Sequence, residues 1–120
     1  MKYRVYGDDY VIVMEKGEEI LQVLTEVCRR EQILLGTVTG IGAVGEVTLG
    51  VFNTEKFGYE SRTYTGDFEI ASCSGNISTM DGKTYLHIHL AAGKTEKGQC
   101  HGGHLSRGDI SLNGECFVHR

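Results

Sequence analysis

The chain contains no proline among its 120 residues, whereas it contains 17 glycines. Glycine at that density, among many β-branched residues, favours strands joined by tight turns and bulges over a bundle of helices. The apolar fraction of 40% and the charged fraction of 23% are ordinary for a globular protein. A chain of this length can build one hydrophobic core, so we expect a single domain that covers residues 1–120.

Long apolar runs are also absent from the sequence. No stretch approaches the roughly 18 apolar residues that a membrane span needs, and the first ten residues, MKYRVYGDDY, lack the apolar core of a secretion signal. We therefore expect a cytoplasmic protein without a membrane partner. The sequence also has no Cys-x-x-Cys pair, which favours reduced thiols over disulfides. We expect Cys28, Cys73 and Cys116 to fill the core.

An excess of positive charge is lacking as well. The formal net charge is −4, so the chain as a whole offers no electrostatic footprint for nucleic acid. A local basic patch would form only if the fold or an assembly gathered the scattered basic residues, which include Arg29, Arg30, Arg62, Lys94, Lys97 and Arg107.

The first third of the chain predicts a hairpin followed by one helix. Two β-prone runs, 1–6 and 10–14, flank the turn-forming residues Gly7-Asp8-Asp9. From Gly17 the apolar period becomes helical, with acidic residues at the start of the segment and Arg29 and Arg30 at its end, as the helix dipole favours. The apolar stripe expected to pack on a sheet consists of Ile20, Leu21, Leu24, Val27 and Cys28.

Residues 40–45 match the pattern Gly-x-Gly-x-x-Gly of dinucleotide-binding proteins. That motif requires a helix directly after the glycines, but residues 46–51 have the composition of a strand. We therefore interpret the glycines as a turn between two strands. Residues 54–62 are polar and predict a loop.

The remaining segments predict a series of antiparallel strands. In residues 68–73 we expect Phe68, Ile70 and Ser72 to lie on one face of a strand. Asp81-Gly82 predicts a two-residue hairpin to the next strand. Near the end we expect a turn at residues 107–109 and a last strand, 110–118, interrupted at Asn113-Gly114.

The segment YLHIHLAAGKTEKGQCHGGHL, residues 85–105, holds four of the five histidines. In an extended conformation His87 and His89 lie on one face, with Cα atoms about 6.6 Å apart along the strand. Both rings can then reach one metal ion, because each Zn–N bond needs only about 2.0–2.1 Å. His-x-His pairs also occur as half-buried structural histidines, and the spacing alone leaves that alternative open.

His104 is the best candidate for a third metal ligand, because Gly102-Gly103 allow close approach of the chain. Three imidazoles would leave a fourth position open for water or a ligand. His101 and Cys100 are possible extra ligands. A divalent ion is expected, and three imidazoles suit zinc best, although nickel, copper, iron and cobalt are permitted.

Several motifs, in this order, resemble the PPC (plants and prokaryotes conserved) domain, which in plants follows AT-hook motifs of nuclear proteins. They are Gly40-x-Gly42-x-Val44, Gly66-Asp67-Phe68-Glu69-Ile70, Ser74-Gly75-Asn76, Asp81-Gly82, His87-x-His89, and Gly102-Gly103-His104-Leu105 followed by Glu115. The resemblance implies an α+β fold, a mostly antiparallel sheet with one amphipathic helix packed on it, that assembles as a homotrimer. It also implies a metal site on His87, His89 and His104.

The match departs from the plant domain at two points. Asp67 stands where the plant segment has an arginine tied to partner interaction, and the basic AT-hook is absent, as a chain without proline requires.

Three functions follow as expectations. The first is a trimeric metal-binding protein with a regulatory or ligand-sensing role, in which a small molecule can bind at the metal. The second is a zinc-dependent enzyme that uses metal-bound water for hydrolysis or hydration, with Glu69 or Glu115 as a candidate general base. The third is association with DNA through the trimer, which the net charge opposes.

Overall fold

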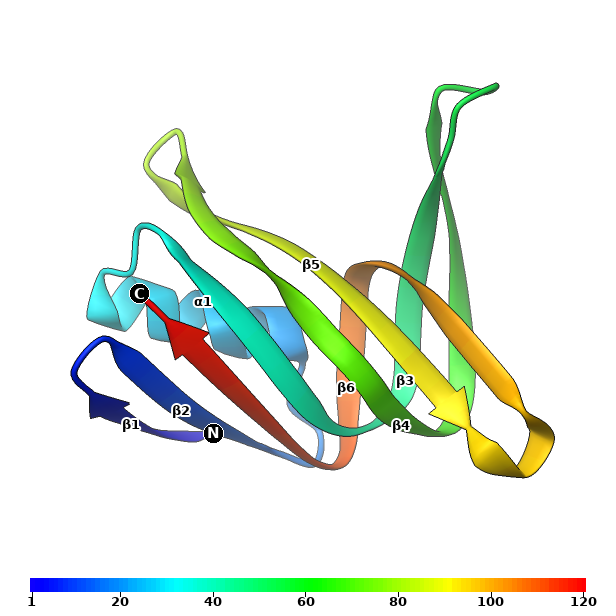
Figure 1. Cartoon of the computed structure of the whole chain (residues 1–120), viewed down its shortest axis with the longest axis horizontal. Coiled ribbons are helices and arrows are strands. Elements are labelled where there is room, and N and C mark those ends of the chain that lie inside the picture. Colours follow the sequence, from blue (N-terminus) through cyan, green and yellow to red (C-terminus); the bar gives the residue numbers. More distant parts are fainter.

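A computed structural model describes residues 1–120, apart from the side chain of Lys97. The chain forms one helix, one short 3-10 turn and six strands (Figure 1). In order these are β1 (Lys2–Tyr6), β2 (Asp9–Glu15), α1 (Ile20–Glu31), β3 (Gly36–Asn53), β4 (Gly58–Met80), β5 (Lys83–Lys94), η1 (Thr95–Lys97) and β6 (Gln99–His119). The expected α+β class, a mostly antiparallel sheet with one main helix, is confirmed.

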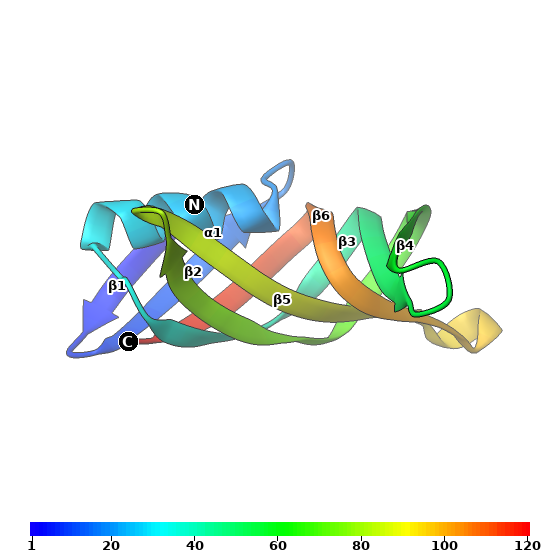
Figure 2. The same cartoon turned by 90° about the horizontal axis from the view of Figure 1, so that it is seen from above.

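All strand pairs are antiparallel, in the order β1-β2-β6-β3-β4-β5. β5 also pairs with the first part of β6, so β6, β3, β4 and β5 close into a ring at one end of the molecule. The predicted hairpin at the start is confirmed, because Tyr6 pairs with Asp9. Figure 2 shows α1 lying along one face of the sheet.

Helix α1 begins where Glu19 caps it, since the carboxylate of Glu19 accepts hydrogen bonds from the backbone N–H groups of Leu21 and Gln22. The helix turns its apolar stripe to the sheet as predicted, with one change. Val23 is buried in the stripe, whereas Leu21 is only partly buried beside it. The core lies between this stripe and the inner face of the sheet and continues into the ring, where Phe68, Leu90 and Leu105 are buried.

The predicted turn at residues 40–45 is wrong, because β3 runs without a break from Gly36 to Asn53. Its pairing with β4 slips at Gly40/Gly42 and at Val44/Glu46, as β-bulges do. Gly42 has φ +143° and lies so close to β6 that a Cβ there would be 2.4 Å from the carbonyl oxygen of Asn113. The glycines therefore bend one long strand rather than reverse the chain.

The predicted loop at 54–62 is confirmed only for residues 54–57, which form a turn, whereas residues 58–62 belong to β4. β3 and β4 continue beyond the ring as a twisted two-stranded hairpin, in which Phe52 pairs with Tyr59 and Asn53 pairs with Gly58 (Figure 1). We call residues 51–60 the arm. Phe52 lies edge-on to both Phe57 and Tyr59, with each pair of ring centroids 5.3 Å apart. This aromatic cluster holds the arm together outside the core.

Two further expectations about strands are corrected. A register shift in the β4–β5 pairing between Ile70 and Ser72 changes the alternation, so that Cys73 is buried and Ser72 is exposed. The last strand, β6, is continuous over 21 residues instead of starting after a turn at 107–109. Near the positions where interruptions were expected, the pairing of β6 with β3 shows register shifts.

Neither helical segment in the described chain has the length and apolar character that crossing a membrane requires.

Candidate metal site

The hairpin between β4 and β5 presents the first two histidines. Asp81 and Gly82 both have positive φ, at 53° and 75°, as the central residues of the predicted two-residue turn require. This turn pairs Asn76 with His87 and Ser74 with His89. Ile88 and Leu90 point into the core and are almost fully buried. The alternation of the strand therefore turns His87 and His89 to the outer face, as predicted.

Strand β6 delivers the third histidine, because His104 pairs with His89 on β5 and with Gly50 on β3. The close approach predicted for the Gly-Gly-His motif is present at Gly103, where a Cβ would be 2.6 Å from the carbonyl oxygen of Gly50. At Gly102 a Cβ would meet only ordinary contacts, at 3.6 Å or more. Gly103 therefore allows β6 to lie against β3 and to place His104 beside β5.

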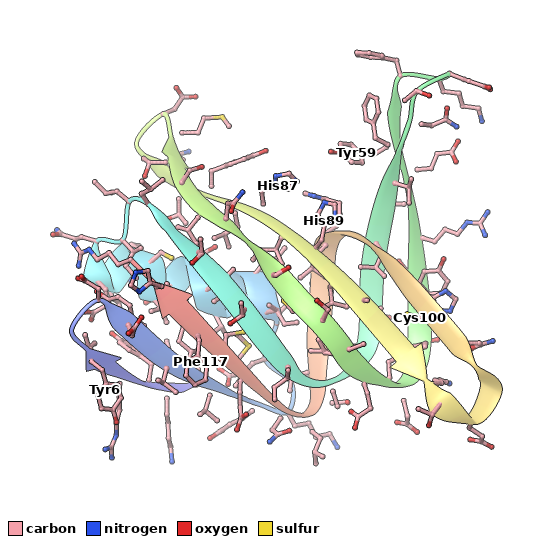
Figure 3. All side chains as sticks on the ribbon, in the orientation of Figure 1. Tyr6, Tyr59, His87, His89, Cys100 and Phe117 are labelled. Carbon is pink, nitrogen blue, oxygen red and sulfur yellow. The ribbon has the colours of Figure 1, made fainter. Side chains whose placement is uncertain are left out.

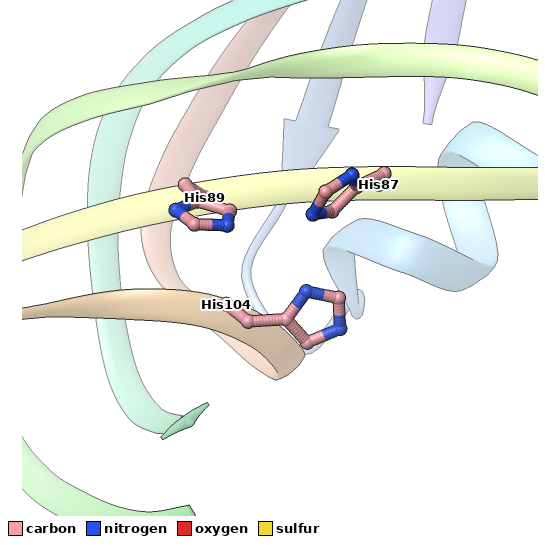
Figure 4. A group of neighbouring side chains, drawn as sticks. All are labelled: His87, His89 and His104. Atoms are coloured by element: carbon pink, nitrogen blue, oxygen red, sulfur yellow. The ribbon is translucent and has the colours of Figure 1, made fainter. Parts of the chain in front are cut away.

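The three imidazoles form one group, in which potential ligand nitrogens all lie within 4.8 Å of one another. The ring centroids are 5.3 Å apart for His87 and His89, 5.4 Å for His87 and His104, and 6.0 Å for His89 and His104. Figure 4 shows a nitrogen of each ring turned toward the space between them. His87 and His89 are exposed and His104 is half-buried, so the group opens to solvent on one side.

His104 carries an unusual polar atom. Its Nδ1 is buried and has no hydrogen-bond partner among the described residues. A buried polar atom without a partner is costly, and a metal ion would supply the missing interaction. Burial, followed by the positive charge that His87 and His89 can carry, lowers the pKa of His104 below its ordinary value of 6.5. This favours the neutral imidazole that metal ligation needs. The donor set therefore fits a metal ion.

The arm borders the site through Tyr59. Its ring lies against the imidazole of His104, with the two centroids 5.4 Å apart, and Figure 3 shows Tyr59 on the arm at the side of the molecule where His87 and His89 lie. Tyr59 was not among the residues predicted for the site, because residues 54–62 were expected to form a loop. The aromatic residues Phe52 and Tyr59, on either side of the polar residues 53–56, could have indicated a hairpin, since a hairpin there would pair these two residues.

The two possible extra ligands lie apart from the three-histidine group. His101 stacks on Tyr64, with ring centroids 3.8 Å apart and planes at 15°, and it also meets the edge of Phe68. Because Leu105, on the same side of β6 as His101, is buried, His101 faces the ring interior and His104 faces outward. Cys100 is exposed and pairs with Gly93, four residues along β5 from His89 (Figure 3).

The two candidate general bases also lie away from the histidines. Glu69 pairs with Gly93, whereas His89 pairs with Ser74, which separates Glu69 from His89 by about 13 Å along the sheet. Glu115 lies on β6 between Val13 of β2 and Ile41 of β3, and it lines a shallow hollow of about 360 Å³ together with Phe117 and Ser72. Neither carboxylate belongs to the three-histidine group.

The basic residues considered for DNA contact lie on different elements. Arg29 and Arg30 on α1 both pair with Glu26, at 2.7 Å and 2.8 Å. Arg107 pairs with Asp109 at 3.2 Å, and the ammonium group of Lys94 lies 4.9 Å from the centre of the Phe68 ring. The side chain of Lys97 falls outside the described part of the structure. These contacts give most of the named cations a local partner.

Solved structures of other proteins closely match the fold. One, from Bacteroides thetaiotaomicron, is provisionally named a DNA-binding protein; it is 34% identical, with a TM-score of 0.92 over 98% of this chain and 82% of that one. A PPC protein from Pyrococcus horikoshii is 31% identical, with a TM-score of 0.87 over 99% of this chain and 81% of that one. A metal-containing protein from Archaeoglobus fulgidus is 30% identical, with a TM-score of 0.88 over 98% and 81% of the two chains.

Among curated proteins, none matches the chain. The family model described as the Plants and Prokaryotes Conserved (PCC) domain matches residues 1–120. The fold agrees with that match, and the chain belongs to the Plants and Prokaryotes Conserved domain family.

Proposed function

We propose that this protein binds one divalent metal ion per chain on His87, His89 and His104, and that zinc fits this donor set best. The observation that carries the proposal is the group of ring nitrogens within 4.8 Å of one another, in which the buried Nδ1 of His104 has no other partner among the residues that the structure describes. A relative that is 30% identical is a metal-containing protein, which supports the same conclusion.

The metal serves a regulatory or ligand-sensing role in this proposal. Three protein ligands leave one coordination position for a small molecule, and the exposed rings of His87 and His89 leave that side of the group open. Catalysis by metal-bound water would also need a nearby general base. The positions of Glu69 and Glu115 away from the group favour binding over hydrolysis.

A cobalt titration tests the metal site. Cobalt(II) added to metal-free protein should saturate at one ion per chain and give the visible absorption of a tetrahedral centre. The variants His87→Ala, His89→Ala and His104→Ala should each lose the saturable signal. His101→Ala is the matched control, because its ring stacks on Tyr64 outside the group, and it should titrate like the parent.

A zinc-dependent enzyme is the second candidate, and the open side of the histidine group favours it. The zinc-loaded protein and its His87→Ala variant should be compared on ester, phosphoester and amide substrates. Turnover by the parent that is lost in the variant would establish an enzyme. Equal activity or equal inertness of the two proteins would remove this candidate.

We also propose that the protein assembles as a homotrimer. The sheet face opposite α1 exposes Val13, Ile41 and Phe117 on the neighbouring strands β2, β3 and β6, and their side chains are 39%, 59% and 55% exposed. These side chains lie around Glu115, and an apolar patch with polar residues beside it is typical of an interaction surface. Native mass spectrometry should give three times the chain mass. An Ile41→Asp/Phe117→Asp variant should give a smaller assembly, whereas Leu34→Asp, outside this patch, should not.

Association with DNA is the third role, and relatives from Bacteroides thetaiotaomicron and Ralstonia eutropha are provisionally named DNA-binding proteins. The net charge of −4 opposes it. Contacts to phosphates would make any binding strongly dependent on salt. A mobility-shift assay with duplex DNA at low salt and micromolar protein decides the point, since no shift under these favourable conditions would end this candidate.

A further inference from the structure

A groove beside the histidine group has no role in the functions considered so far. It encloses about 540 Å³ and is bordered by Leu35, Thr37, Asn76, Tyr85, His87 and His119. His87 belongs both to this groove and to the metal-ligand group. A molecule bound at the open side of the group therefore has the groove next to it.

The floor of the groove crosses four neighbouring strands. His87 pairs with Asn76, Asn76 lies opposite Thr37, and Thr37 pairs with His119. Three steps between strands correspond to a length of about 14 Å. The groove is thus long enough for an extended small molecule that starts at His87.

The sides of the groove are apolar, and its far end is polar. Leu35 and Tyr85 border it with side chains that are 72% and 44% exposed. At the far end Nδ1 of His119 is hydrogen-bonded to the carboxylate of Asp9 at 2.6 Å, and the guanidinium group of Arg120 donates hydrogen bonds to the hydroxyl of Tyr10 and the carbonyl of Gln32. The apolar part of a bound molecule would therefore gain contacts along the sides of the groove but not beyond its polar end.

The charge of the metal ion favours a negatively charged head group on such a molecule. Three neutral imidazoles leave the two positive charges of a divalent ion uncompensated, and the group contains no carboxylate. Zinc accepts carboxylate oxygen as a ligand. An anionic head at the open position would supply the missing negative charge.

We propose that the groove binds the apolar body of a small carboxylate whose head lies at the three-histidine group. Leu35 and Tyr85 contact the body, and His87 separates head from body. This inference rests on the proposed metal site and adds to it the chemical class of the ligand: a carboxylate with an unbranched or flat apolar part no longer than the groove.

Calorimetric titration of the zinc-loaded protein with acetate, butyrate, hexanoate, octanoate and decanoate tests the proposal. Each added methylene should lower the dissociation constant by between about twofold and fourfold throughout this series, because even an extended decanoate chain is shorter than the path from His87 to His119. Leu35→Asp should bind acetate like the parent but lose the dependence on chain length. Leu112→Asp is the control, because Leu112 is 74% exposed and does not border the groove.

Zinc content and oligomer mass are measured on the same samples. An equal affinity for all five carboxylates, or an unchanged chain-length dependence in Leu35→Asp, would overturn the ligand class while leaving the metal site in place. A smaller assembly of Leu35→Asp, without carboxylate binding by the parent, would identify the groove as an interface between copies instead. A parent protein that retains no zinc would remove the proposed function itself.

Discussion

The ring of Tyr59 lies against the imidazole of His104, with the two centroids 5.4 Å apart and the planes tilted by 37°. This contact joins the arm to the candidate metal site. The buried Nδ1 of His104 has no hydrogen-bond partner in the part of the chain that the structure describes. Packing against Tyr59 therefore helps to hold this imidazole in place, together with its contacts to His87 and His89.

Removal of the Tyr59 ring should weaken metal binding. Aromatic pairs contribute about 0.5–1.5 kcal/mol beyond simple burial, so Tyr59→Ala should raise the zinc dissociation constant between about twofold and tenfold in competition with a chromogenic chelator. Tyr59→Phe should retain the parent affinity. Phe57→Ala is the control, because Phe57 contacts Phe52 within the arm and its side chain is 83% exposed. Equal losses in the Tyr59 and Phe57 alanine variants would point to the stability of the arm instead.

Neighbouring glycines of the Gly-Gly-His motif should respond differently to alanine. A Cβ on Gly103 would be 2.6 Å from the carbonyl oxygen of Gly50, whereas at Gly102 the nearest contact is 3.6 Å. Gly103→Ala should lower the free energy of unfolding by about 1–3 kcal/mol, because β6 must move away from β3. Gly102→Ala should change it by less than about 0.5 kcal/mol. Urea denaturation measures both.

The displacement of β6 from β3 in Gly103→Ala should also affect the three-histidine group. Because His104 follows Gly103 directly, Gly103→Ala should also weaken zinc binding, and Gly102→Ala should not. Normal zinc affinity in a destabilised Gly103→Ala variant would contradict the role given to this close approach.

The pKa values of His104 and His119 should be shifted in opposite directions in the metal-free protein. Burial and then the neighbouring histidines hold the pKa of His104 below 6.5, whereas the hydrogen bond to Asp9 raises the pKa of His119 above 6.5. NMR titration of the ring protons should give a pKa below 6.5 for His104 and above 6.5 for His119. Asp9→Asn should lower the pKa of His119. His104 midpoints above 6.5 would contradict the burial of its ring.

The shift of His104 also sets a pH dependence of stability. The unfolded chain binds a proton at this residue more readily than the folded chain does, so its contribution to stability is present above about pH 6.5 and is lost as the pH falls through the lowered pKa of the folded state. Protons also compete with the metal for all three rings. Zinc should therefore leave the protein on acidification below about pH 6.5, and retention well below pH 5 would indicate carboxylate ligands instead.

Thiol reactivity should separate Cys100 from the other cysteines. Burial raises the pKa of Cys28 and Cys73 to about 11, and burial together with the charge of Cys73 raises that of Cys116 to about 12. Only Cys100 is exposed, so the folded protein should show one fast-reacting thiol with a disulfide reagent. Zinc should not slow that reaction. Protection of the fast thiol by zinc would show that Cys100 joins the site.

The sequence was sufficient to predict the elements whose signal is local. The period of the apolar residues predicted α1, Asp81-Gly82 predicted the β4–β5 turn, and alternation placed His87 and His89 on one face. Each of these depends on residues within a few positions of one another. The Gly102-Gly103-His104 motif then gave the third ligand candidate, His104, and the resemblance to the family added the overall fold.

The bulges and the arm could not be predicted in the same way. Whether Gly42 reverses the chain or only bends it depends on how β6 packs against it, which is a contact with Asn113 far along the sequence. The pairing of β5 with β6 likewise makes residues 99–104 part of a strand, whose alternation turns His101 and His104, three residues apart, to opposite faces. Tyr59 reaches the site only because β3 and β4 extend past the ring.

Elemental analysis by mass spectrometry on untagged protein, beside the variants His104→Ala and His101→Ala, tests the central claim most directly. We expect about one zinc per chain in the parent and in His101→Ala, and none in His104→Ala. The absence of metal from the parent after reconstitution with zinc, or an equal metal content in all three proteins, would contradict a metal site on His87, His89 and His104.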